Sequence, residues 1–264
     1  SMSVSVENYQ KDQGTFDVVI RDVKTPAGVS KVQVPVWAAD GQKDLIWYSA
    51  TKQSNGSYKA TISMAEHDYL VGDYNIHVYL RTKNGVLKTY VAPTLNVTMP
   101  NVDISAVDTE KKETTYALKI TNEGILKNVK RVQFAVWSEK NGQDDLVWYE
   151  GSKETAGQWT ATADITKNHK TSGKYQVHVY AITVDGSSHF LGKTTFEVTE
   201  PSMSVSVENY QKDKGTFDVV IDDIETPAGV SQIQVPVWCV DGQKDLIWHI
   251  ATKQSDGSYK TTIN

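Results

Sequence analysis

The residues of this sequence that could act in catalysis do not form a catalytic motif. Zinc sites and Cys–His nucleophiles need partners at fixed spacing, such as H-E-x-x-H or a histidine set beside a cysteine. Cys239 is the single cysteine, which excludes an intrachain disulfide. The six histidines show none of these spacings: His67, His77, His169, His178, His189 and His249. Paired acids such as Asp144 and Asp145 fall at predicted turns, not across a cleft. We therefore expect no enzyme activity in this chain, no metal ion and no cofactor.

Tryptophan, histidine and tyrosine recur in a pattern that favours binding over catalysis. The segment VPVWAADGQKDLIWY begins at Val34, and it returns as FAVWSEKNGQDDLVWY from Phe134 and as VPVWCVDGQKDLIWH from Val235. Aromatic side chains that stay exposed on a soluble domain tend to mark binding sites, and their flat rings suit the C–H faces of sugars. Which of these rings face solvent depends on the strands that carry them.

These strands belong to a repeated unit of about 100 residues, the size of an independently folding domain. Residues 1–63 match residues 202–264 at 50 of 63 positions, and the middle copy keeps both tryptophans and the segment G-x-Y-x-[IV]-H-V-Y. Copies end in VTMPN and VTEPS, and proline-bearing joints of this kind stiffen the connection between domains. We predict three domains, at 1–100, 101–201 and 202–264.

The third copy is incomplete, because it stops where the first copy has reached Ser63. It lacks the last two strands of the unit, which leaves the third strand without a neighbour and part of the core uncovered. We expect a partner chain to cover this region, as a dimer formed by two incomplete copies.

Within each copy the sequence pattern is that of β-strands. Short segments rich in Val, Ile, Tyr and Thr alternate apolar with polar residues, and turn signals separate them. About seven antiparallel strands in a unit of this length predict an all-β protein built from tandem Ig-like β-sandwiches. Tyr74 and Tyr175 open the sixth strand of their copies, where we expect them in the core as tyrosine corners.

Alternation along a strand predicts which side chains point outward, because successive residues face opposite sides of the sheet. In the third strand Val34 and Val36 form the core face, which turns Trp37 outward. The sixth strand, its neighbour in an Ig-like sheet, turns His77 and Tyr79 outward. The predicted ligand-binding residues of the three copies are therefore Trp37, His77, Tyr79, Trp137, His178, Tyr180 and Trp238. The alternative is that these rings only pack against each other or against a neighbouring repeat.

The second tryptophan of each copy has two possible positions. If Asp40 and Gly41 form a two-residue hairpin turn, Trp47 lies opposite Val34 and belongs to the core. If the loop is longer, a one-residue shift turns Trp47 to the outer face beside Trp37. We favour the core position, and this choice predicts core roles for Trp47, Trp148 and Trp248.

Composition limits the partners that the chain can have. The formal net charge is −5, whereas nucleic-acid-binding domains usually present a basic face. No apolar run approaches the roughly 18 residues of a membrane-spanning helix, and no signal-peptide pattern is present. We expect neither nucleic-acid binding nor membrane insertion, and we expect any secretion signal to lie outside this sequence.

The segments VQVPVWAADGQKDLIWY, NGSY and GDYNIHVYL resemble the streptococcal Bsp-like repeat, and the resemblance covers all three copies. Such repeats occur in tandem in surface and wall-hydrolase proteins of lactobacilli and streptococci, and they precede the catalytic domain of streptococcal autolysins. The resemblance implies a secreted, wall-associated array that binds peptidoglycan or wall polysaccharide and targets a muramidase-like domain outside this chain. The middle copy departs from the others by Ala135 in place of Pro35, so identical ligand preference across the copies does not follow.

Tandem duplication also argues for binding. Duplicating a weak binding site multiplies avidity through effective concentration, whereas duplicating an active site gains an enzyme little. The alternative function is a structural spacer or an adhesin stalk that contacts protein partners.

Overall fold

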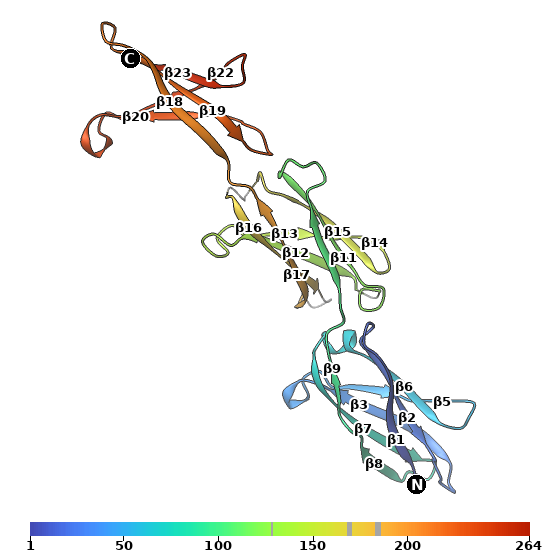
Figure 1. Ribbon diagram of the computed structural model, residues 1–264. Helices are drawn as coiled ribbons and strands as arrows, with labels where there is room; N and C mark the ends of the chain where they lie inside the picture. Colours follow the sequence, from blue (N-terminus) through green and yellow to red (C-terminus); the bar gives the residue numbers. More distant parts are fainter. Residues whose placement is uncertain (128, 168–170, 183–185) are drawn as a thin grey trace.

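The computed structural model describes residues 1–127, 129–167, 171–182 and 186–264, and its regular structure is almost entirely β. Figure 1 shows three β units arranged one after another, with the N-terminus in the first and the C-terminus in the third. Each unit is built from antiparallel sheets, so the prediction of an all-β protein with tandem sandwiches is confirmed. Among the described residues, no helix is long and apolar enough to cross a membrane.

Repeat 1 is a sandwich of two antiparallel sheets. One sheet has the order β1-β2-β6-β5, and the other has the order β4-β3-β7-β8, with β9 pairing the start of β7. The strands are β1 (Ser3–Gln10), β2 (Thr15–Arg21), β3 (Val29–Trp37), β4 (Ile46–Ser49), β5 (Thr51–Lys52), β6 (Tyr58–Ser63), β7 (Gly72–Thr82), β8 (Leu87–Val91) and β9 (Leu95–Val97). β4 and β5 are halves of one extended segment that changes sheet at Ala50, whose N–H donates to the Val32 carbonyl at 3.0 Å.

Repeat 2 follows the same topology, with the sheet orders β10-β11-β15-β14 and β13-β12-β16-β17. Its strands within the described residues are β10 (Asp103–Val107), β11 (Thr115–Thr121), β12 (Arg131–Ser138), β13 (Val147–Glu150), β14 (Ser152–Thr155), β15 (Gln158–Asp164), β16 (Gly173–Ile182) and β17 (Ser188–Val198). The change of sheet falls at Gly151, where a Cβ would lie 2.8 Å from the carbonyl oxygen of Val132. A glycine therefore suits this crossing.

Repeat 3 contains part of the sandwich. Its strands are β18 (Ser202–Gln211), β19 (Thr216–Glu225), β20 (Gln234–Val237), β21 (Ile247–Ile250), β22 (Thr252–Lys253) and β23 (Tyr259–Ile263). They form a four-stranded sheet of order β18-β19-β23-β22 and a two-stranded sheet, β20-β21. Residues 202–264, all of them described, contain no counterpart of β7, β8 or β9.

The core follows the alternation that the sequence predicts. The inward residues of β3 and β7 are buried: Val32, Val34, Val36, Tyr74, Ile76, Val78 and Leu80. The hydroxyl of Tyr74 donates to the Leu70 carbonyl at 2.9 Å, and the hydroxyl of Tyr175 donates to the Thr171 carbonyl at 2.8 Å. Both tyrosines therefore lie in the core and bond four residues upstream, as a tyrosine corner does.

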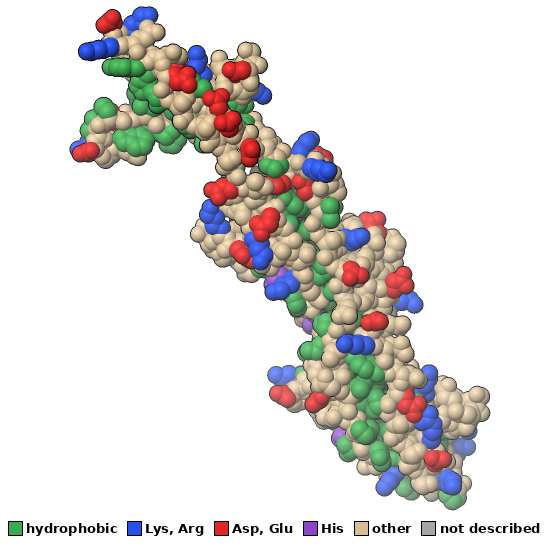
Figure 2. All heavy atoms as spheres, in the orientation of Figure 1, with side chains coloured by type: hydrophobic (Ala, Val, Ile, Leu, Met, Phe, Trp, Pro, Cys, Tyr) green, Lys and Arg blue, Asp and Glu red, His purple; other side chains and the backbone are tan. Residues whose placement is uncertain are grey.

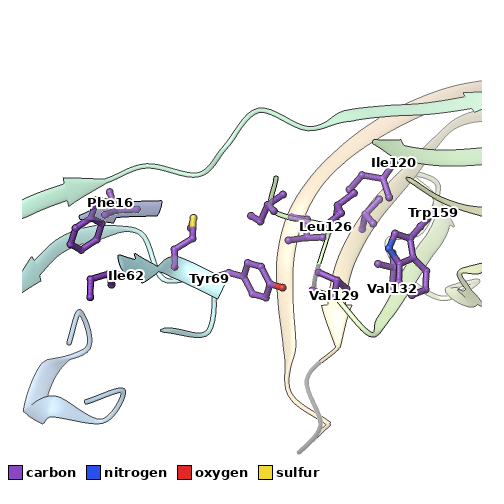
Figure 3. Packing of buried hydrophobic residues seen from close by; sticks show 14 of the residues in the cluster. Phe16, Ile62, Tyr69, Ile120, Leu126, Val129, Val132 and Trp159 are labelled. Carbon is purple, nitrogen blue, oxygen red and sulfur yellow. The ribbon is translucent and has the colours of Figure 1, made fainter. Parts of the chain in front are cut away.

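Repeats 1 and 2 meet in an apolar joint. Figure 3 shows Tyr69 of repeat 1 pointing towards the repeat 2 cluster that includes Leu126 and Val129, and all three side chains are buried. The loop that carries Leu126 also touches the turn between β1 and β2, since Asn122 Nδ2 donates to the Asp12 carbonyl at 3.3 Å. At Gly124 a Cβ would lie 2.7 Å from the same carbonyl oxygen, so the backbones of the two repeats are in direct contact.

Candidate ligand-binding face

The outer surface of the sheet formed by β4, β3 and β7 gathers four aromatic side chains, which we call the aromatic face of repeat 1: Trp37, Trp47, His77 and Tyr79. The rings of Trp37 and His77 meet edge to face with their centroids 4.9 Å apart. The rings of Trp47 and Tyr79 meet in the same way at 5.2 Å. The three residues predicted to point outward from β3 and β7 lie on this face, and Trp47 joins them.

The core positions predicted for the second tryptophan of each copy are wrong. The exposed fractions of the side chains are 48% for Trp47, 46% for Trp148 and 58% for Trp248. All three side chains are therefore exposed rather than buried. The second tryptophan therefore belongs to the outer face in all three repeats.

The register of β4 on β3 explains the difference. Trp47 pairs with Pro35 and Tyr48 pairs with Val34, one residue away from the pairing that a two-residue turn would give. The loop is longer because residues 38–45 contain a 3-10 turn at Asp40–Gln42, and the shift reverses the face of every residue in β4. The sequence holds a signal for this, since Glu150 shares the face of Trp148 and an unburied carboxylate marks the outer side.

Asp44 fixes the loop that carries Trp47. Its carboxylate accepts hydrogen bonds from the N–H groups of Ala38 at 2.9 Å and Ala39 at 2.8 Å, and it lies 3.0 Å from Nδ1 of His67. Burial opposes ionisation, but these hydrogen bonds outweigh it and hold the pKa of the Asp44 carboxyl below its usual value. The ionised carboxylate of Asp44 therefore holds the start of the loop, at Ala38 and Ala39, in a fixed conformation.

The other repeats place an aspartate at the same position. Asp145 accepts from the N–H of Ser138 at 3.0 Å, and Asp245 accepts from the N–H groups of Cys239 at 2.9 Å and Val240 at 2.8 Å. Hydrogen bonds from the Cys239 side chain and from these two N–H groups lower the pKa of the Asp245 carboxyl to about 2. These acids serve the loop, which agrees with the turn role that the sequence predicts for paired acids.

His67 supports the face from below, a role that no sequence pattern predicts. It is fully buried, with Nδ1 facing only acceptor oxygens of Asp44, so this nitrogen carries a proton and donates. Its Nε2 lies 2.9 Å from the hydroxyl of Tyr48, which in turn donates to Glu66 at 2.9 Å. Burial, then the hydrogen bond and charge of Glu66, raise the pKa of the Tyr48 hydroxyl well above its ordinary value. This chain of contacts ties both ends of the Trp47 segment to the core.

Repeat 2 has an aromatic face of the same design. Trp137 and His178 meet edge to face at 4.6 Å, and Trp148 and Tyr180 lie 5.4 Å apart. Phe190 of β17 is an additional member, with its ring 5.2 Å from His178 and 5.6 Å from Tyr180. Sequence alternation did not find Phe190, because a bulge between β16 and β17 sets its side of the sheet.

The two tryptophans of a face have different exposures. Trp137 is 8% exposed and Trp37 is half-buried, whereas Trp47 and Trp148 leave nearly half of their surface in solvent. Burial, with the positive charge of Lys193 second, lowers the pKa of His178 and favours its neutral form. We infer that Trp37 and Trp137 brace the histidines, while Trp47 and Trp148 offer ring surface to a ligand.

Repeat 3 carries the tryptophans without their partners. Trp238 is 47% exposed and Trp248 is 58% exposed, but the strand that would supply a histidine and a tyrosine has no counterpart in residues 202–264. A complete aromatic face is thus described for repeats 1 and 2.

The described residues were also compared with the requirements of a metal site and of a reactive cysteine, and they meet neither. Within the described ranges, no three His, Cys, Asp or Glu side chains come close enough to hold a metal ion. His169 lies outside the described residues.

Cys239 is exposed, and its thiol forms a hydrogen bond to Asp245. This hydrogen bond, followed by the negative charge of Asp245, raises the pKa of the thiol and disfavours the reactive thiolate. Figure 2 shows acidic and basic side chains interspersed over the visible surface, without a basic stripe.

The family model of the GBS Bsp-like repeat matches residues 5–94, 105–196 and 206–264, one match for each β unit. The chain belongs to the GBS Bsp-like repeat family. In this chain the Bsp-like repeat is therefore the unit that carries an aromatic face, and each match includes both tryptophans of its copy. No curated protein matches the sequence.

Solved structures similar to this chain share little sequence identity with it. A polysaccharide deacetylase from Bacillus cereus is 17% identical at a TM-score of 0.32, and a second protein of that description, from Bacillus anthracis, is 20% identical at 0.31. Each match covers 39% of this chain, which spans 31% of the length of the deacetylase. The match to a structure of a 1.5-MDa bacterial ice-binding adhesin covers 100% of this chain and 86% of the adhesin chain, at 13% identity and a TM-score of 0.25. TM-scores this low carry no argument about function.

Proposed function

We propose that this chain is a non-catalytic, multivalent array that binds cell-wall peptidoglycan or wall polysaccharide through the aromatic faces of its Bsp-like repeats. The observation that carries the proposal is the matched exposure of Trp47 and Trp148. Each indole leaves nearly half of its surface in solvent and packs on a tyrosine two strands away in the same sheet, Tyr79 of β7 or Tyr180 of β16. An aromatic patch that stays exposed at the same place in two repeats is typical of a binding surface.

The surroundings of the rings suit a sugar. The C–H face of a pyranose stacks on an aromatic ring, and its hydroxyls need polar groups at the rim. In repeat 1 the residues Gln33 and Ser49 pair beside Tyr79 on the same face. In repeat 2 Gln133 donates to Glu150 at 2.9 Å at the corresponding place. Each face thus combines an apolar platform with hydrogen-bonding groups.

Two faces on one chain favour a polymeric ligand. A single exposed platform of this kind binds weakly, but two sites on one chain raise the apparent affinity for a repeating glycan through effective concentration. The affinity for an insoluble wall should therefore exceed the affinity for a short soluble glycan.

Co-sedimentation with purified streptococcal walls tests the proposal. The double variant Trp47→Ala/Trp148→Ala should weaken wall binding by about 10-fold or more, because both platforms are lost. The matched control is Val71→Ala/Val107→Ala, which truncates two residues that are about as exposed, at 53% and 51%, but lie away from the aromatic faces. Undiminished binding by the tryptophan variant contradicts the site, and no binding by the unaltered chain contradicts the function.

We further propose that the array targets a secreted autolysin to the wall. The tandem arrangement resembles that of automutanolysin of Streptococcus mutans, in which the repeats are followed by a lysozyme-like muramidase domain. The chain alone should leave the turbidity of a wall suspension unchanged. A muramidase joined to the chain should clear walls at a lower concentration than one joined to the double tryptophan variant.

A structural spacer or an adhesin stalk with protein partners is the second candidate. The apolar joint favours it, since Tyr69 and Leu126 belong to one buried cluster and such packing holds neighbouring repeats in a fixed relation. Absence of wall binding at high micromolar concentration would support the spacer, and binding to host matrix but not to walls would support the adhesin.

A further inference from the structure

The aromatic face of repeat 1 continues into a pair of cations beyond Tyr79. Lys31 of β3 and Arg81 of β7 are cross-strand partners, and both are exposed. They lie two residues along the strands from the pair formed by Gln33 and Tyr79, on the same side of the sheet. Two residues of a strand span about 7 Å, so these long side chains can reach a ligand stacked on Trp47 and Tyr79.

The charges of this pair are not balanced within the repeat. Among the described residues, no acid forms an ion pair with Lys31 or Arg81. Arg81 donates to the uncharged carbonyl of Gly85 at 3.4 Å, whereas Arg21 and Arg131 each bind a glutamate. Like charges directly opposite each other on adjacent strands are destabilising. An anion bound between the two side chains would remove this repulsion.

Repeat 2 shows how the same corner of the sheet holds a carboxylate. Glu150 stands where repeat 1 has Ser49, because each of them pairs with the glutamine of the long strand. The carboxylate of Glu150 accepts two hydrogen bonds from the guanidinium of Arg131, both at 3.0 Å, and one from Gln133 at 2.9 Å. Arg131 occupies the position of Lys31. A cation and a glutamine at this corner are therefore sufficient to bind a carboxylate.

Repeat 1 has the receiving groups without the carboxylate. Ser49 is exposed and uncharged. Arg81 adds a second cation where repeat 2 has Ile182, which pairs with Arg131 and is buried. Repeat 1 thus presents two cations and no acid at this corner, whereas repeat 2 presents one cation that its own glutamate neutralises.

We propose that the aromatic face of repeat 1 recognises a sugar that carries a carboxylate, and that Lys31, Arg81 and Gln33 form the subsite for this group. This inference rests on the glycan binding proposed above and names the class of glycan that repeat 1 prefers. The sugar ring stacks on Trp47 and Tyr79, and its carboxylate accepts hydrogen bonds from the ammonium and guanidinium groups. Hydrogen bonds between charged partners are about twice as strong as those between neutral ones. In repeat 2 the internal glutamate already fills this subsite.

Two hexasaccharides of hyaluronan test the inference. One is native, and in the other the carboxyl groups are reduced to alcohols, so the two differ in charge and not in backbone. Each is titrated into the full 264-residue chain and followed through the indole N–H resonances of Trp47 and Trp148, which report on repeats 1 and 2 separately. At Trp47 the native hexasaccharide should bind about 10-fold more tightly than the reduced one, and this preference should be smaller at Trp148.

Removal of the two cations should abolish the preference. Lys31→Gln/Arg81→Gln should bind both hexasaccharides alike at Trp47, with the affinity for the reduced one within about 3-fold of that of the unaltered chain. The control Lys24→Gln/Lys88→Gln removes two charges from the same repeat but away from the aromatic face, since Lys88 pairs with the inward Leu80. It should keep the preference.

Exchanging the residues of the Ser49 and Glu150 positions gives a reciprocal test. Ser49→Glu supplies repeat 1 with its own carboxylate and should weaken binding of the native hexasaccharide at Trp47 by about 10-fold. Glu150→Ser frees Arg131 and should strengthen binding of the native hexasaccharide at Trp148 by about 5-fold. Both positions are exposed, so neither change disturbs the core. Lys193, which pairs with His178 on the second face, is present in every variant and cannot account for the changes.

Three results would overturn the inference: equal affinity of the two hexasaccharides at Trp47, no response of Trp47 to either of them, or a preference that survives both Lys31→Gln/Arg81→Gln and Ser49→Glu. Wall co-sedimentation keeps this failure separate from that of the proposed function. A chain that binds walls but shows no preference retains the function and loses the subsite. A chain that prefers the acidic hexasaccharide but does not bind walls retains the subsite and loses the function.

Discussion

Trp47 lies directly opposite Pro35 across β4 and β3, and Trp148 lies opposite Ala135 in the same way. Repeat 2 reaches this pairing with one more residue between its tryptophans than repeat 1 has. The repeats therefore share the register of the strands and not the length of the loop. An exposed indole opposite a buried Pro35 or Ala135 is thus a shared feature of repeats 1 and 2.

The two tryptophans of repeat 2 should differ in their contribution to stability. Trp137 is 8% exposed and packs on His178, whereas Trp148 is 46% exposed. Truncation of a buried aromatic residue costs about 3–5 kcal/mol, and a half-exposed one costs less. In urea unfolding, Trp137→Ala should shift the transition of repeat 2 clearly more than Trp148→Ala does. Equal shifts would contradict the distinction between bracing and exposed rings.

Removing the Asp44 carboxylate should destabilise repeat 1 by about 2–3 kcal/mol, because two backbone N–H groups lose a charged acceptor and His67 loses its partner. The exposed Asp40→Ala in the same loop is the control and should change little. The folded pKa of Asp44 lies below the unfolded value of about 3.9. Its stabilisation is therefore complete above that pH and is lost as the pH falls through the folded pKa. Urea unfolding between pH 7 and pH 3 measures it, and an acid sensitivity unchanged by Asp44→Ala would contradict the assignment.

His178 should titrate below the usual value of a histidine, which is about 6.5. Burial comes first and the charge of Lys193 second in lowering its pKa. Because the pKa of His178 is lower in the folded state than in the unfolded state, the contribution of neutral His178 to stability is complete above about pH 6.5. This contribution declines as the pH falls through the pKa of His178 in the folded state. NMR titration of the ring Cε1–H resonance measures the midpoint, and Lys193→Ala should raise it. A midpoint above 6.5 in the unaltered chain would be incompatible with this environment.

Cys239 should react slowly with thiol reagents although it is exposed. The hydrogen bond of its thiol to Asp245 at 2.9 Å, followed by the negative charge of that carboxylate, raises the thiol pKa. Less thiolate is then present at pH 8 than for a free cysteine, and the thiolate is the reactive form. Asp245→Asn should increase the rate of modification by 5,5′-dithiobis(2-nitrobenzoic acid) several-fold. Asp241→Asn in the same loop serves as the control, and equal rates in both variants would refute the role of Asp245.

Gly124→Ala should loosen the joint between repeats 1 and 2. A Cβ at this position would lie 2.7 Å from the Asp12 carbonyl oxygen and 2.7 Å from Gln13 Cα, and both belong to the backbone of the other repeat. The repeats must separate to accept it, which exposes Leu126. Small-angle X-ray scattering should show a changed radius of gyration, while Val107→Ala, on an exposed strand position, should leave it unchanged. Identical scattering from Gly124→Ala and the unaltered chain would show that the contact is not maintained in solution.

The features that sequence patterns predict correctly are those set within one strand. Alternation in β3 and β7 places Val34 and Ile76 inward and Trp37 and His77 outward, because each neighbour along a strand reverses the direction of the side chain. The tyrosine corner follows from the same local patterns. The predicted count of about seven strands falls short of the nine strands of repeat 1, in which one extended segment contributes both β4 and β5 to different sheets.

The features that the patterns miss depend on contacts between segments. The face of Trp47 depends on a 3-10 turn in the preceding loop, which alters register by one residue. Phe190 depends on a bulge in a strand pair. His67 reaches Asp44 only after the segment between them has crossed from one sheet to the other, so no spacing along the chain indicates their contact.

The joint between repeats 1 and 2 also makes the order of the repeats matter. Repeat 2 carries Ile125 and Leu126 at its docking loop, where repeat 1 has Thr25–Pro26 and repeat 3 has Thr226–Pro227. Moved to the first position of an array, repeat 2 would leave its leucine in water with no Tyr69 to receive it. The copies are thus not interchangeable modules. The contacts at the joint require repeat 2 to follow repeat 1. An engineered array that changes the order of the copies would therefore lose the fixed spacing between neighbouring aromatic faces.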